Sequence, residues 1–201
     1  VSIRDVTDLY EAYFADIADA LDEPGGLLLK ALGILSVLRH VRERDEPTSR
    51  LIHEAFGLSK QDFWIAIDRL HNLEFVELHG HDLAKISDQI LATFCFHLCF
   101  VKHQALSFEA LIAHFSAGAL QRIQDAVYGA CSTMNVDVVR MVIDAPLIAA
   151  IRQSPPDQQF KLLQSFWFVD PALALQIVAT AIMALPDSPE QSEPKWDDKE
   201  S

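Results

Sequence analysis

The stretch LSKQDFWIAIDRLHNLEFVELHGHDLAKIS, residues 58–87, contains two kinds of periodicity in succession. Its first half has apolar residues at helical spacing, and Ser59 is placed to cap that helix. The apolar face consists of Phe63, Ala66, Ile67 and Leu70. In the second half, the apolar runs LEFVEL and LAKI flank HGHD, where Gly80 can take the positive φ of a tight hairpin. The stretch therefore predicts a helix followed by a β-hairpin.

An amphipathic helix is predicted at residues 2–21, and two further helices are predicted between it and this stretch. Residues 27 to about 44 carry leucines along one stripe and end in the charged run RERDEP. Residues 47–56 form a shorter amphipathic helix, which Gly57 stops. Three helices followed by a two-stranded wing make a winged-helix arrangement.

The residues after the hairpin predict a series of helices. Ser87 or Asp88 is placed to cap a helix that is apolar nearly all round as far as Lys102, so we expect it to be buried. Further helices are expected at residues 107–115, 117–131, 135–152, 155–168 and 171–184. Pro146 should kink or split the 135–152 helix. The final two helices should be antiparallel neighbours, like the start of a helical repeat array.

The predicted fold class is therefore mainly α, with a winged-helix unit, a small β-hairpin wing and a repeat-like helical array. We expect a lid-like helical lead-in over residues 1–26, a winged-helix domain with its following buried helix over 27–104, and the helical array over 105–185. The polar, proline-rich residues 186–201 should be a disordered tail. Because the chain begins without methionine inside a predicted helix, we expect it to be a piece of a longer protein.

Composition and charge narrow the classes of function. Half of the 201 residues are hydrophobic, which is enough for a sizeable core. The sequence has no apolar run long enough to span a membrane and no signal-peptide pattern, so we expect a cytoplasmic protein. With 16 Lys and Arg against 29 Asp and Glu, the net charge of -13 repels phosphate backbones and anionic surfaces. We therefore expect neither a nucleic-acid nor a membrane partner.

Two groups of residues are of metal-ligating type. One is spaced along a single helix face and consists of Cys95, Cys99 and His103. The other surrounds the hairpin turn and consists of His79, His81 and Asp82. Structural zinc sites usually gather ligands from two chain segments, and a free cysteine often behaves as a small buried hydrophobe. Core packing and an exposed polar turn are the simpler interpretations, with metal binding as the alternative.

The winged-helix shape also allows a DNA-binding regulator as an alternative function. The outward positions of the 59–70 helix are predicted to be Lys60, Gln61, Trp64, Asp68 and Arg69. These positions mix both signs of charge, and the wing adds acidic residues, whereas phosphate recognition favours clustered cations. A third alternative is a helical adaptor that binds peptides. The sequence has neither a Gly-x-x-x-x-Gly-Lys-Ser/Thr loop nor a Gly-x-Ser-x-Gly elbow, so we expect no enzyme activity within it.

The order of these features resembles that of bacterial STAND-type signalling ATPases, relatives of the NACHT and AAA+ P-loop proteins. The resemblance spans residues 2–185 in organisation and rests on KISDQ after the wing and on the stretch from Trp167 to Pro171. It implies a regulatory region with no cofactor of its own, which packs on ATP or ADP held by an upstream nucleotide-binding domain. It also implies coupling to a downstream helical sensor, an oligomer on activation, and a role in antiphage defence.

Many STAND proteins carry a Met-His-Asp motif after the wing, with the histidine at the nucleotide's β-phosphate. Ile86, Ser87 and Asp88 stand at the corresponding place, so a hydroxyl donor replaces the histidine. Lys85 adds a positive charge two residues before Ser87. The resemblance thus implies that Lys85, Ser87 and Asp88 lie near the nucleotide, with Trp64 as a further interface residue. A helix cap at Ser87 or Asp88 fits the same residues without a ligand.

Overall fold

The computed structural model describes Leu21, residues 26–80 and residues 82–183. The chain divides into two compact units, Val1–Val169 and Asp170–Ser201. The predicted N-terminal helix, His81 and the predicted tail after residue 186 lie outside the described residues. Each described helix is too short or too polar to traverse a lipid bilayer.

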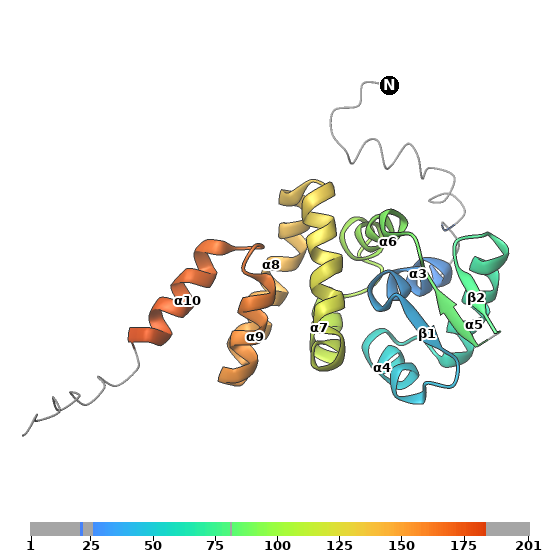
Figure 1. The fold of residues 1–201 in the computed structure, drawn as a ribbon, viewed down its shortest axis with the longest axis horizontal. Helices are drawn as coiled ribbons and strands as arrows, with labels where there is room; N and C mark the ends of the chain where they lie inside the picture. The colour runs from blue at the N-terminus through green and yellow to red at the C-terminus, as the bar shows by residue number, and fades with distance from the viewer. Residues whose placement is uncertain (1–20, 22–25, 81, 184–201) are drawn as a thin grey trace, which may run out of the picture. The chain divides into compact units, whose positions relative to one another are not determined.

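The first unit is mainly helical and contains one small antiparallel sheet (Figure 1). It opens with α3 (Leu27–Leu38), β1 (His40–Arg42), α4 (Glu46–Phe56), α5 (Lys60–Asn72), β2 (Glu77–His79) and β3 (Leu83–Lys85). The strand order is β1-β3-β2, so β3 is central. Lys85 of β3 pairs with His40 on one side and Glu77 on the other. Because strand residues alternate between faces, these three side chains share the exposed face.

Strand β1 contradicts the prediction of a helix from residue 27 to about 44. Helix α3 ends at Leu38 because Arg39 takes a positive φ of 67° and its N–H donates to the carbonyl oxygen of Leu35. The next three residues alternate exposed, buried and exposed, and they pair with β3. The predicted two-stranded wing is therefore part of a three-stranded sheet, and its strands are shorter than the apolar runs.

The local signals at helix and hairpin ends are confirmed. The Ser59 hydroxyl accepts a hydrogen bond from the Asp62 N–H at 3.1 Å at the start of α5. Gly57 ends α4 with a φ of 65°, and Gly80 has a φ of 59° in the hairpin turn. Ser59 accepts a hydrogen bond from a nearby backbone N–H, and each glycine takes a positive φ at its own position. Because these features involve only neighbouring residues, the sequence alone could locate them.

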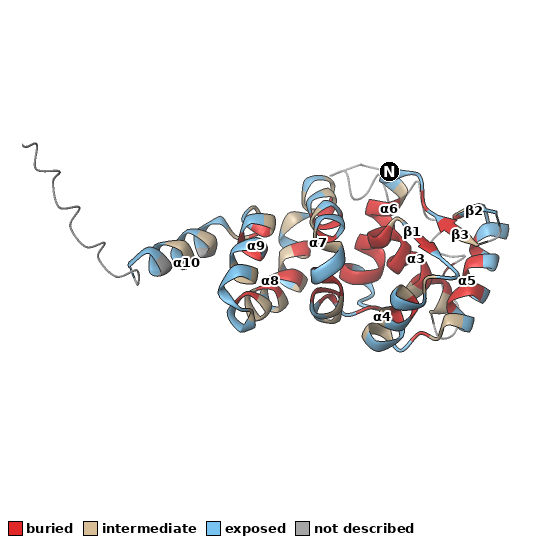
Figure 2. Ribbon diagram, turned by 60° about the horizontal axis from the view of Figure 1, so that its bottom comes forward, coloured by how far each residue is buried: buried red, intermediate tan, exposed pale blue. Residues whose placement is uncertain are grey.

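The core lies between α3 and the helix that follows the sheet. That helix consists of α6 (Gln89–Phe96) and a π-helical continuation, η1 (His97–Lys102). Helix α3 is almost wholly buried in Figure 2, and α6 is buried from Ala92 to Phe96, after exposed residues at its start. Helices α3 and η1 approach each other closely at Gly33, where an added Cβ would lie 2.3 Å from Cys99 Sγ. The buried helix predicted to reach Lys102 is confirmed, although its second half is π-helical.

Three more helices complete the described part of the first unit: α7 (Phe108–Thr133), α8 (Val136–Gln153) and α9 (Pro156–Phe166). The two helices predicted at 107–115 and 117–131 are the two parts of α7, and the break between them is a kink at Ala119, later in the chain than predicted. The helix is not split at Pro146, since α8 runs through it, and the alternative of a kink there stays a prediction. One lost hydrogen bond is offset there by a buried stripe on both sides of the proline, formed by Val139, Ile143, Leu147 and Ile151. The second unit contains α10 (Pro171–Met183).

Candidate functional site

The turn from β3 into α6, residues 85–89, is the strand-to-helix corner. The Asp88 carboxylate accepts a hydrogen bond from the Leu91 N–H at 2.8 Å, so Asp88 caps α6. Ser87 is exposed and does not cap α6. As hydrogen-bond donors, the Ser87 hydroxyl and then the His79 ring lower the pKa of Glu77 on β2. The corner therefore shows which of the two candidate caps is used: Asp88 caps the helix, and Ser87 lies beside a carboxylate.

Arg39 holds the corner against α3, and sequence reasoning missed it. Its carbonyl oxygen accepts a hydrogen bond from the Ile86 N–H at 3.1 Å, and its guanidinium donates to the side-chain oxygen of Gln89. Partial burial lowers its pKa, while the carboxylates of Asp125 and Asp88 oppose that shift. The signal available in the sequence was an arginine after an apolar run, followed by the alternating polar and apolar residues His40, Val41 and Arg42.

Trp64 does not lie where the sequence predicted. Its side chain is only 9% exposed, and its ring meets Phe63 edge-on at a centroid distance of 5.9 Å. The buried indole Nε1 has no hydrogen-bond partner among the described residues. The prediction that the Trp64 side chain points outward is therefore wrong. A large indole ring stabilises the fold when it is buried, and the spacing of apolar residues along the helix did not show this. The exposed positions of α5 include Gln61, Ile65, Asp68 and Arg69.

Of the two candidate metal clusters, the one formed by Cys95, Cys99 and His103 is fully described, whereas His81 of the hairpin cluster lies outside the described residues. No group of three His, Cys, Asp or Glu side chains in the part of the chain that the structure describes is placed to hold an ion. Burial raises the pKa of the Cys99 thiol to about 12 and also raises that of Cys95. At the hairpin, His79 contacts Glu77 at 3.0 Å, and Asp82 lies 3.9 Å from Arg42.

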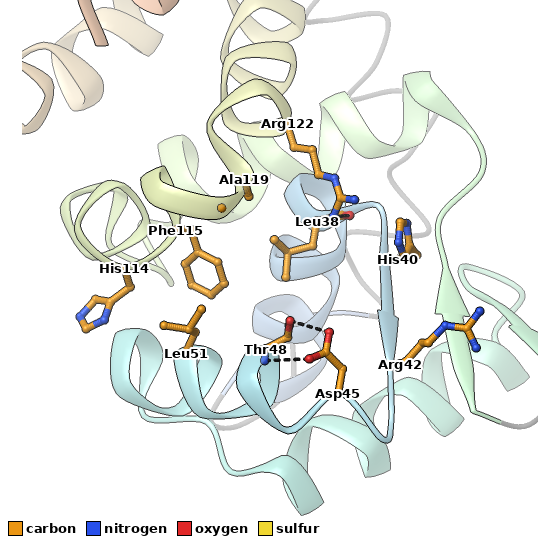
Figure 3. Close-up of a pocket in the computed structure, with 11 residues that line it drawn as sticks. Leu38, His40, Arg42, Asp45, Thr48, Leu51, His114, Phe115, Ala119 and Arg122 are labelled. Atoms are coloured by element: carbon orange, nitrogen blue, oxygen red, sulfur yellow. Dashed lines mark hydrogen bonds between the residues drawn. The ribbon is translucent and has the colours of Figure 1, made fainter. Parts of the chain in front are cut away.

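A second polar site lies between β1, the start of α4 and the kinked part of α7; we call it the β1–α7 cleft (Figure 3). It has a volume of about 390 Å³. Its ionisable lining residues are His40, Arg42, Asp45, His114 and Arg122. Arg122 crosses from α7 to donate to the Leu38 carbonyl oxygen at 2.9 Å. The sequence did not reveal this cleft, because its cationic residues are about eighty positions apart.

The electrostatic environment of the cleft is positive although the chain is acidic. Burial lowers the pKa of His40, and the positive charges of Arg122, Arg42 and Lys85 lower it further. The Asp45 carboxylate accepts hydrogen bonds from the Thr48 N–H at 3.1 Å and the Thr48 hydroxyl at 2.7 Å. Asp45, the acidic residue in the lining, therefore caps α4.

Comparisons of the chain with protein-family models, with curated proteins and with solved structures give no match. The nucleotide-proximal role of Lys85, Ser87 and Asp88 remains a prediction. A functional proposal must therefore rest on the two polar sites and on the arrangement of elements that positions them.

Proposed function

We propose that this chain is a non-catalytic regulatory region of a STAND-type signalling ATPase. In this proposal, residues 27–104 are its winged-helix domain, and the helices after residue 105 begin a repeat-like array that leads to a sensor. The order α3-β1-α4-α5-β2-β3, with β3 central in the sheet, supports the winged-helix assignment. The parent protein would be cytoplasmic, hold ATP or ADP upstream, and act in antiphage defence.

The strand-to-helix corner is the observation that carries this proposal. Ser87 and Lys85 both lower the pKa of the exposed Glu77 carboxyl, the hydroxyl as a hydrogen-bond donor and the ammonium through its charge. A phosphate group offers the same kind of acceptor as a carboxylate, and it carries more charge. We infer that Glu77 occupies these donors when the nucleotide is away and that a nucleotide phosphate replaces it in the assembled protein.

The surface of α5 supports a protein partner over a nucleic-acid partner. Its exposed positions combine Gln61 and Ile65 with one acid, Asp68, and one base, Arg69. Lys60 at its start is paired with Glu46. Duplex binding depends on several cations that displace counterions from phosphates, and this helix lacks such a row. Nucleotide state would instead be transmitted by two alternative packings of the domain against its neighbours.

The whole protein tests this proposal through the nucleotide that it retains. Ser87→Ala should release bound ADP several-fold faster than the parent protein, whereas Ser87→Thr should retain it, because threonine keeps the hydroxyl. Ser132→Ala, an exposed serine on α7, is the matched control. Retained ADP is measured by chromatography after gel filtration and denaturation.

The gene provides an independent test. The ATPase proposal requires a Gly-x-x-x-x-Gly-Lys-Ser/Thr loop encoded upstream of Val1. A gene without that loop, or an unchanged ADP release rate in Ser87→Ala, would contradict it. Tight, salt-sensitive binding of duplex DNA in a gel shift would favour the transcriptional regulator instead.

A further inference from the structure

The β1–α7 cleft combines a cationic rim with an apolar floor. Leu38, Leu51 and Phe115 form the floor, and Figure 3 shows them pointing into the space between α4 and α7. His40 and Arg122 lie together at one side of that floor in the same view. A ligand that fits both parts needs an apolar body and an anionic group at one end.

The cations of the rim retain capacity for a ligand. The Nη1 group of Arg122 donates a hydrogen bond to the Leu38 carbonyl oxygen. A guanidinium has five N–H donors, so Arg122 can also donate to a ligand. Arg42 lies 3.9 Å from Asp82, and in Figure 3 its side chain extends away from the floor of the cleft. Both oxygens of Asp45 already accept hydrogen bonds from Thr48, so this carboxylate is fixed at the helix start. An incoming anion would therefore be held chiefly by Arg122.

The size of the cleft sets the class of ligand. A volume of about 390 Å³ falls in the range of sites for small organic molecules and far exceeds the needs of a free inorganic anion. The wall at the α7 kink is open, since a Cβ added to Gly118 would meet nothing within 4 Å. The cleft therefore has space for the ring of a ligand as well as for its charged end.

We propose that the β1–α7 cleft binds a nucleoside monophosphate or a phosphate monoester of similar size, with its phosphate at Arg122 and His40 and its ring over Leu38, Leu51 and Phe115. This binding site is built from residues other than Lys85, Ser87 and Asp88. It therefore stands independently of the proposed ATPase role. A ligand in this cleft would contact both β1 and α7, which are distant in sequence.

Isothermal titration of the 201-residue chain tests the site, with the four ribonucleoside 5′-monophosphates, adenosine and inorganic phosphate as probes. We expect at least one monophosphate to bind at least ten-fold more tightly than adenosine and inorganic phosphate. Affinity should fall as sodium chloride is raised, because the phosphate end is held by charge. Failure of all four monophosphates to bind, or equal binding of adenosine, would overturn the proposal.

Variants separate the rim from the cavity. Arg122→Gln removes a rim charge and should weaken binding at least ten-fold, whereas Arg152→Gln, an exposed arginine on α8, should leave it unchanged. Gly118→Leu fills the cleft without altering any charge and should also abolish binding.

Because Arg122 also bonds to Leu38, each variant's melting temperature is compared with the parent's. Binding that survives both Arg122→Gln and Gly118→Leu in folded protein would place the ligand elsewhere. Ser87→Ala should bind normally, which distinguishes this site from the corner.

Discussion

The inner layer of α3, α6 and η1 differs sharply from the outer layer of α8 and α9. Ten of the twelve residues of α3 are buried, against four of the eighteen residues of α8. The inner helices are apolar nearly all round and pack on several neighbours, whereas α8 buries one stripe. Stability should therefore be concentrated in the inner layer. The polar corner and cleft lie at its edges, where side chains remain available to ligands.

The largest expected contrast is between two phenylalanines. Phe100 in η1 is fully buried and stacks on Phe96 at 5.0 Å, whereas Phe160 on α9 is 53% exposed. Phe100→Ala should lower the unfolding free energy by about 4 kcal/mol through lost burial and a cavity. Phe160→Ala should lower it by no more than about 1 kcal/mol, as an exposed position usually does. Urea unfolding measures both, and comparable losses would break the distinction between layers.

Two glycines sharpen the same contrast. An added methyl at Gly33 would lie 2.3 Å from Cys99 Sγ and 2.7 Å from Cys99 Cβ, so Gly33→Ala forces α3 and η1 apart. We expect a loss of about 2 kcal/mol from this overpacking. At Gly118 the same change meets open space and should stabilise the chain by about 0.5 kcal/mol, through the lower chain entropy of alanine in the unfolded state. Thermal unfolding of the two variants should therefore shift in opposite directions.

At the corner, variants of Asp88 and Ser87 separate the helix cap from the proposed ligand-binding role. Asp88→Ala removes the cap of α6 and should cost about 1 kcal/mol of unfolding free energy. Ser87→Ala removes an exposed hydroxyl that does not cap the helix, so it should change the unfolding free energy far less than Asp88→Ala. Equal losses in chemical denaturation would mean that Ser87 also supports the helix start.

The smallest expected effect is a pH dependence at His40. Burial and the charges of Arg122 and Arg42 hold its pKa in the folded chain below the ordinary value of 6.5. The unfolded chain therefore binds the proton more readily, so stability falls as pH drops from about 7 through that value. His40→Gln should reduce the slope of unfolding free energy against pH in this window. A slope unchanged by the substitution would show that the cleft does not perturb His40.

Several elements could be predicted because each depends on neighbours in sequence. Apolar spacing predicted α4 and α5, Ser59 and Gly57 marked their ends, and Gly80 located the hairpin turn. Asp88 was one of two candidate caps, and the structure shows that it is the one used. Local hydrogen bonds and backbone conformation decide these features, so a single sequence window contains the needed information.

Tertiary packing decided the rest. The strand at His40–Arg42 exists because β3, more than forty residues later, supplies its hydrogen bonds, and these outweigh continuation of α3.

By itself, the sequence determined a mainly helical chain with an apolar central helix pair, a hairpin and an excess of negative charge, since these follow from composition and short-range periodicity. Only the tertiary structure decided that Trp64 is buried, that Ser87 faces Glu77 and that His40 and Arg122 share one cleft. The physical reason is distance along the chain: solvent exclusion and electrostatic fields act between atoms close in space, and no local pattern specifies which distant residues will meet.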